Sequence, residues 1–210
     1  MTTQKKIAVA LSMGALLVAG CATFPDEAKT RQSAEKMVLD AFSFAPVHKK
    51  RLDQDESQRI CSKYPGQQPT QQEAARVVQL ARASIKYPED GKLVGNWKVG
   101  DKLAHNGAGD RIRNGKLEKR KENGGLCQNC HGLAPGEVNV GNVGPSLTGF
   151  GKTRGNSEAT AKYVYEKIYN AWAYYPCSNM PRLGTNNHLT IKQITDLVAF
   201  IVDPASPINK

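Results

Sequence analysis

The stretch Cys127-Gln128-Asn129-Cys130-His131 decides the fold of this 210-residue chain. It is a C-x-x-C-H motif, which is the attachment signature of a c-type haem. In such a motif the two thiols add to the vinyl groups of the porphyrin as thioethers, and the adjacent imidazole reaches the iron from the proximal side. We therefore predict one covalent haem c, attached through Cys127 and Cys130, with His131 as an axial ligand of the iron.

Two other uses of a C-x-x-C pair fit the rest of the sequence less well. A redox-active pair needs no histidine at the next position, and a structural zinc site needs a second pair of ligands. The chain has no second C-x-x-C, and His48, His105 and His188 lack the spacing of a zinc-binding histidine pair. A chance occurrence of the pentapeptide is the other alternative, and the exported context described next argues against it.

The first twenty residues have the pattern of a secretory signal peptide. Lys5 and Lys6 precede an apolar run over 7–18, and small residues follow. The run is shorter than the roughly 20 residues that a membrane-spanning helix needs. The string ending at Cys21 also resembles a bacterial lipobox, so lipidation of Cys21 is expected, with ordinary cleavage beside an incidental cysteine as the alternative. We expect an exported protein in the periplasm, anchored to a membrane by lipid if Cys21 is modified.

The chain is basic, with a formal net charge of +10. Residues 1–20 hold two of the positive charges and no negative one, so the exported part carries about +8. A basic excess can indicate nucleic-acid binding, but export argues against that partner. An acidic protein partner fits better, because complementary charge steers association.

The five cysteines divide into groups with different expected roles. Cys21 and the haem pair leave Cys61 and Cys177, which we expect to form a disulfide in an oxidising compartment. Spacing in the sequence does not show whether the geometry of the two residues allows the bond.

Apolar periodicity and capping signals indicate a mainly α protein. We predict a helical N-terminal extension over 22–95 and a cytochrome c domain over 96–210 that encloses the haem. The basic run over 111–121 is expected to be a solvated loop or a partner-docking rim. The expected helices cover residues 26–44, 70–87, 99–106, 157–169 and 190–203.

The sixth ligand of the iron is expected to come from a loop between the last two helices. Met180 lies there, and a thioether suits the haem iron of an electron carrier because it raises the reduction potential. His188 and His105 are the bis-histidine alternatives, and Cys177 is a thiolate alternative if it is unpaired.

Two features resemble known cytochromes more closely. Gly144-Pro145-Ser146-Leu147 resembles the Gly-Pro-x-Leu of class I cytochromes c, in which the proline carbonyl accepts the Nδ1–H of the proximal histidine; a simple turn is the alternative. The segments Asn142–Gly149, Asn179–Gly184 and Leu189–Phe200 resemble the SoxX family, the small c-type cytochrome subunits of SoxAX complexes. That resemblance covers Trp97 to Asn209, about half of the chain.

The resemblance implies a role in periplasmic sulfur oxidation. It implies the electron-transfer subunit, not the catalytic one, of an L-cysteine S-thiosulfotransferase, so no catalytic residue is expected here. A SoxA-like cytochrome subunit would join thiosulfate to a cysteine of a SoxYZ-like carrier, and this chain would pass the electrons to a downstream cytochrome. Cys127, Cys130, His131 and Met180 match the family's haem-binding positions. The extension over 22–95 is longer than a minimal SoxX requires.

Two alternatives stay open. One is a free-standing periplasmic electron carrier, and the other is a haem that is itself catalytic, which would need an open sixth position. Cys177 lies three residues before Met180, so a bond to Cys61 would tether the loop that carries the axial ligand. We therefore expect the extension to hold this loop and to keep the haem closed, which favours electron relay.

Overall fold

The computed structural model describes residues 26–41, 53–114, 116–138 and 140–210. The chain divides into two compact units, residues 1–50 and 51–210, and each is described by itself. The expected signal peptide and the lipidation site Cys21 lie outside the described residues, as does His48.

The described part of the first unit is a single helix, α2 (Glu27–Ala41). Asp26 begins it by accepting a hydrogen bond from the backbone N–H of Ala28 at 2.9 Å. Met37 of this helix is 72% exposed. The structure confirms the helix expected over 26–44 as far as Ala41, and residues 42–44 lie outside the described part of the chain.

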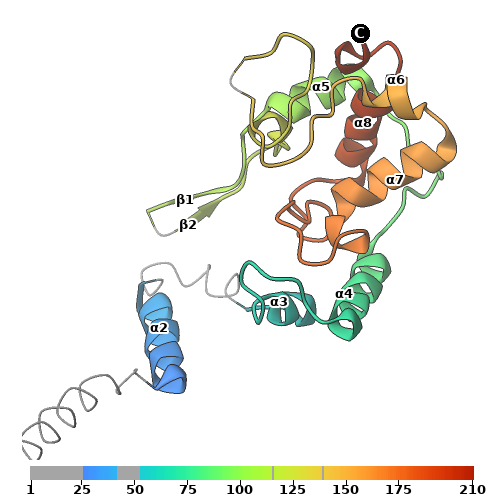
Figure 1. Cartoon of the computed structure of the whole chain (residues 1–210). Coiled ribbons are helices and arrows are strands. Elements are labelled where there is room, and N and C mark those ends of the chain that lie inside the picture. Colours follow the sequence, from blue (N-terminus) through green and yellow to red (C-terminus); the bar gives the residue numbers. More distant parts are fainter. Residues whose placement is uncertain (1–25, 42–52, 115, 139) are drawn as a thin grey trace, which may run out of the picture. The chain divides into compact units, whose positions relative to one another are not determined.

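The second unit is mainly α, as predicted, and Figure 1 shows the order of its elements. Its longer helices surround one apolar core, and short 3-10 turns and one small hairpin connect them. The helices are α3 (Glu56–Cys61), α4 (Gln71–Ser84), α5 (Trp97–His105), α6 (Phe150–Arg154), α7 (Glu158–Tyr169) and α8 (Ile191–Val202); the 3-10 turns are η2 (Cys127–Asn129), η3 (Ala171–Ala173) and η4 (Pro207–Asn209); the strands are β1 (Arg111–Arg113) and β2 (Lys116–Glu118).

Capping residues explain where the long helices begin. Ser157 and Thr190 are the N-caps of α7 and α8, and the reciprocal capping box of Thr190 with Gln193 is present as predicted. Helix α4 begins after Thr70 as expected, but it ends at Ser84 instead of near Tyr87. The backbone becomes extended at Ile85, and that side chain packs against the core of the haem domain.

Helix α8 crosses α5, as expected of a class I cytochrome c (Figure 1). The sequence placed this crossing near Lys102 and Leu103, and Leu103 is indeed buried. The closest backbone approach lies at Gly100, where an added Cβ would come within 2.0 Å of the carbonyl oxygen of Asp196. A glycine is required there because only a residue without a side chain lets the two backbones approach so closely.

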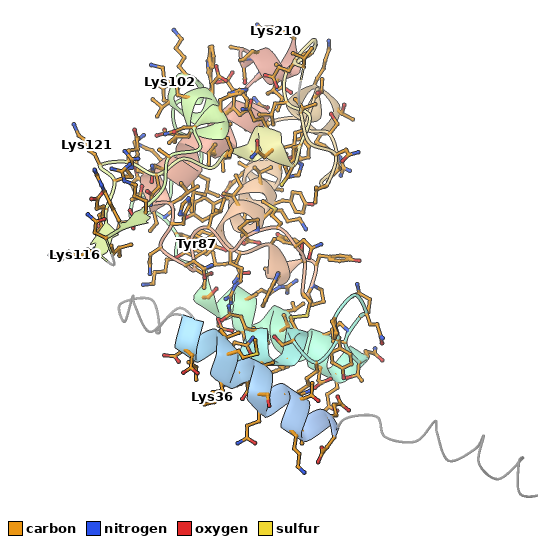
Figure 2. The ribbon with its side chains drawn as sticks, turned by 90° about the vertical axis from the view of Figure 1, so that its left-hand side faces the viewer. Lys36, Tyr87, Lys102, Lys116, Lys121 and Lys210 are labelled. Carbon is orange, nitrogen blue, oxygen red and sulfur yellow. A yellow bond between two sulfur atoms is a disulfide. The ribbon has the colours of Figure 1, made fainter. Side chains whose placement is uncertain are left out.

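The basic run was expected to be a solvated loop or a partner-docking rim, and the structure corrects the loop to an antiparallel hairpin of β1 and β2. The signal that was missed is Asn114-Gly115, a dipeptide strongly favoured in two-residue hairpin turns. Asn114 adopts φ 50°, the left-handed conformation that such a turn requires. Figure 2 shows Lys116 and Lys121 in this region, with side chains that extend away from the helices.

The segment 53–95 belongs to the same compact unit as the haem domain, so the boundary expected at residue 96 is not a boundary between units. A disulfide joins Cys61 to Cys177, the pairing expected from the sequence. Tyr165 of α7 donates a hydrogen bond to the carbonyl of Lys86 at 2.6 Å, and its ring stacks on that of Tyr87. This segment therefore packs directly on α7 and on the chain that follows it.

Candidate functional site: the haem-binding motif and its axial loop

The C-x-x-C-H motif forms a 3-10 turn, η2. The backbone N–H groups of Cys130 and His131 both donate to the carbonyl of Cys127, at 3.1 and 2.9 Å. In a 3-10 turn the side chains at positions i and i+3 eclipse one another, which places both cysteines on one side of the turn. Leu126, just before it, has φ 44°, a left-handed conformation uncommon for a residue with a side chain.

The segment after the motif returns along it through backbone hydrogen bonds. Gly141 donates to Gln128, Gly144 to Cys130 and Leu147 to Gly132, each at 2.8 Å. This approach leaves little room for side chains, because a Cβ on Gly141 would lie 1.8 Å from a carbonyl oxygen of the motif. The glycines after the motif therefore allow the chain to pack closely around the histidine.

His131 is oriented by the backbone of Pro145. Its Nδ1 lies 2.7 Å from the carbonyl oxygen of Pro145, the contact that the Gly-Pro-x-Leu resemblance implied. A carbonyl oxygen only accepts hydrogen bonds, so Nδ1 carries the proton and Nε2 keeps the lone pair that an iron ion requires. The contact sets both the tautomer and the direction of the ring.

The residues of the motif fit a covalent haem. Cys127 and Cys130 are both outside disulfide bonds, and Cys127 packs against the apolar core. Burial raises the pKa of the Cys127 thiol to about 11, so this thiol is protonated at neutral pH when no haem is attached. Within the described residues no group of three or more His, Cys, Asp or Glu side chains has the arrangement of a metal site. Because both thiols are outside disulfides and the imidazole is oriented by Pro145, these three side chains fit the attachment of a haem.

The three alternatives to Met180 as sixth ligand are engaged elsewhere. The Nε2 of His188 lies 3.0 Å from the carbonyl oxygen of Gly124. Both ring nitrogens of His105 have acceptors, and Cys177 is in the disulfide. Met180 is half-buried and packs against the core that Cys127 also contacts. These contacts favour Met180 over the other candidates.

The contacts that hold the Met180 loop from the side of α3 were not predicted from the sequence. The guanidinium of Arg182 lies 2.7 Å from a carboxylate oxygen of Asp55, the N-cap of α3. The same guanidinium lies over the ring of Trp172, 4.5 Å from its centroid. These residues were missed because 127 positions separate Asp55 from Arg182, and neither belongs to a periodic pattern or a motif.

Substituting Gly144 by alanine should displace the proximal histidine. The added Cβ would come within 2.3 Å of Cε1 of His131, whose ring cannot move away while the Pro145 carbonyl and the iron hold it. We expect at least a tenfold loss of haem-loaded protein, measured as haem-stained product relative to total protein. Gly109→Ala is the control, because its nearest atom would be 3.5 Å away. Normal haem loading of Gly144→Ala would contradict this account of the site.

His105 ties α5 to the loop after the haem motif, and this contact should depend on pH. Burial of the ring opposes its charged form, but hydrogen bonds to the Asp101 carbonyl and to Glu137, together with both acidic charges, outweigh burial and raise the pKa of His105. When Glu137 is ionised both partners accept, so only the doubly protonated ring donates to both of them. A raised pKa in the folded protein adds stability that is complete below the unfolded value of about 6.5 and is lost as the pH rises through the folded value.

The wild type should therefore exceed His105→Gln in free energy of unfolding by more at about pH 5 than at about pH 8. Urea titrations of both proteins at several pH values measure this difference. A difference that does not change with pH would show that His105 acts only through packing.

Comparisons with known proteins agree with the geometry of this site. A family model described as "Cytochrome c" matches residues 124–203, which include the motif, the Pro145 contact, Met180 and α8. The chain is also 38% identical over 210 residues to an uncharacterized lipoprotein of Aquifex aeolicus (strain VF5), with 98% of each chain covered. No helix in the described segments has the length and the apolar character to cross a membrane. The chain therefore belongs to one family with this lipoprotein and contains a mainly α cytochrome c domain, which implies a covalently bound haem c of the electron-transfer type.

Proposed function

We propose that this protein is a monohaem electron relay of the periplasm, anchored to a membrane by lipid on Cys21. Cys127 and Cys130 attach the haem, His131 binds the iron on the proximal side, and Met180 binds it on the other. The observation that carries the proposal is the engagement of the other candidate ligands, together with the anchoring of the Met180 loop. An iron with two protein ligands exchanges electrons without opening a site for a substrate.

The lipid anchor is supported by two observations. The string before Cys21 resembles a lipobox, and the relative whose name calls it a lipoprotein aligns with nearly the whole chain, including this region. Expression with a labelled fatty acid tests the anchor. The wild type should carry the label and sediment with membranes, whereas Cys21→Ser should be unlabelled. Labelling of Cys21→Ser at wild-type level would contradict the proposal.

We further propose that the relay is a SoxX-like subunit of a thiosulfate-oxidising L-cysteine S-thiosulfotransferase. The support is the resemblance around Asn142–Gly149 and Asn179–Gly184 to that family. The partners would be a SoxA-like catalytic cytochrome, a SoxYZ-like carrier protein and a downstream acceptor cytochrome. The exposed basic hairpin offers a surface for an acidic partner, because its cationic side chains gather beside the chain that enters the haem motif.

Affinity purification of the tagged full-length protein from its own membranes tests this role. Recovery of a second c-type cytochrome, and haem reduction that requires thiosulfate and the carrier protein, would support it. Recovery of a lone monomer that a respiratory dehydrogenase reduces would instead favour a free-standing electron carrier.

Charge reversal at Lys116 and Lys121 should slow reduction by an acidic partner and weaken the salt dependence of that reduction.

A further inference from the structure

We propose that Arg182 is a positioning residue for the axial ligand Met180, and that Asp55 and Trp172 hold it in place. The proposal rests on the proposed function, since it assumes that Met180 binds the iron. It assigns to α3, a helix outside the segment matched to the cytochrome c family, a direct influence on the coordination of the haem.

Arg182 is an unusual side chain for a loop, because it is charged and almost completely buried. Its side chain is 8% exposed, and its Nη1 donates to Oδ2 of Asp55 at 2.7 Å. A buried guanidinium is strongly unfavourable without a partner. The paired arrangement therefore restrains the backbone at 182, two residues after Met180.

Trp172 connects this pair to the backbone next to the ligand. Its ring lies under the guanidinium at 4.5 Å, within the range of a cation–π interaction. Its indole Nε1–H donates to the carbonyl of Ser178 at 2.7 Å, and the hydroxyl of Ser178 accepts the backbone N–H of Met180 at 3.2 Å. A continuous set of contacts thus leads from Asp55 to the residue that carries the thioether.

Helix α3 holds the loop on both sides of Met180. Asp55 caps the first turn of the helix and binds Arg182, while Cys61 ends the helix and is bonded to Cys177. One attachment alone would let the loop pivot, whereas two attachments that flank the ligand oppose movement of the thioether away from its position. The ion pair also reaches Met180 through the Trp172 ring, which stacks on Arg182, and through the hydrogen bonds at Ser178.

Asp55→Asn separates this role from the helix cap. Oδ1 of Asp55 accepts the backbone N–H of Gln58 at 2.8 Å, and asparagine preserves that cap, since it is among the best N-cap residues. The substitution removes the negative charge that faces Arg182. With the amide oxygen kept at the cap, it also places an N–H₂ group where Oδ2 accepted the hydrogen bond from Arg182. A matched control is Glu56→Gln. Glu56 is the next residue of α3, and the substitution removes the charge from its exposed 2.7 Å ion pair with Arg76 of α4.

The experiment titrates the ferric, haem-loaded full-length protein with imidazole, which competes with the thioether for iron. The far-red charge-transfer band of Met-ligated ferric haem reports the displacement. Asp55→Asn and Arg182→Gln should each bind imidazole about tenfold more tightly than the wild type, equivalent to about 1.4 kcal/mol. The double variant should not exceed the single variants by another tenfold, because both remove one interaction. Glu56→Gln should match the wild type.

The outcomes separate this proposal from the one on which it rests. If the wild type lacks the far-red band, Met180 is not the ligand, and both proposals fail. If the band is present but Asp55→Asn binds imidazole with wild-type affinity, the haem assignment stands and the positioning role is wrong. The same conclusion follows if Glu56→Gln tightens imidazole binding as much as Asp55→Asn does, because the effect would then reflect a general loss of stability. Asp55→Asn keeps the test decisive even if Arg182→Gln does not fold.

Discussion

Met180→Ala is expected to abolish the far-red charge-transfer band of the ferric protein and to lower its reduction potential. The thioether favours ferrous iron, so its loss should shift the potential by more than about 59 mV, a tenfold change for a one-electron couple. The vacated position should then bind imidazole or cyanide without competition. Optical redox titration and ligand titration of the haem-loaded protein measure both effects.

A second methionine supplies the control for this experiment. Met37 lies on α2, in the other compact unit, and is exposed. Met37→Ala should keep the band, the potential and the resistance to external ligands. Persistence of the band in Met180→Ala would refute the ligand assignment, and the engaged histidines would then need to be reconsidered.

Removal of the Cys61–Cys177 disulfide should produce the largest loss of stability. The bond closes a loop with a sequence separation of 116 residues. The chain-entropy model assigns about 4–5 kcal/mol to a loop of this length, and native disulfides typically contribute about 2–5 kcal/mol. The double variant Cys61→Ser/Cys177→Ser is the appropriate test, because either single variant would leave a thiol that could bind the iron.

Urea unfolding of the full-length, haem-loaded double variant measures the loss. The variant should also bind imidazole more tightly, since the loop that carries Met180 would lose its covalent attachment to α3 and keep the Arg182 contact. Mass spectrometry of non-reduced wild-type peptides should recover Cys61 linked to Cys177. Unchanged stability of the double variant, or two alkylatable thiols in the native protein, would show that the extension does not hold the loop covalently.

Local features were readable from the sequence because a few adjacent residues determine them. The C-x-x-C-H motif predicted covalent haem attachment through Cys127 and Cys130, and the structure places both cysteines on one short turn, η2. Helices were expected to begin near Ser157 and Thr190, and in the structure both residues cap their helices, since one side chain can accept the first N–H groups of a helix. The hairpin was missed although Asn114 signalled it, because a run of cations looked like a solvated loop.

Long-range features needed the tertiary structure. The crossing of α5 and α8 was expected near Lys102 and Leu103, but the close backbone contact at Gly100 was not, because helical periodicity predicts a face and not where two backbones meet. The disulfide could be expected from elimination among five cysteines, but its effect on Met180 depends on where α3 lies.

The sequence by itself determined that this chain carries a covalent haem, that it is mainly α and that His131 and Met180 are the best candidate ligands. Those conclusions depend on residue types at fixed short spacings, where the chemistry of attachment leaves little choice. Only the tertiary structure decided which competing ligands are engaged and how Asp55 meets Arg182 across 127 positions. A partly buried ion pair between residues of no periodic pattern leaves no signal in a sequence, because only folding brings its two members together.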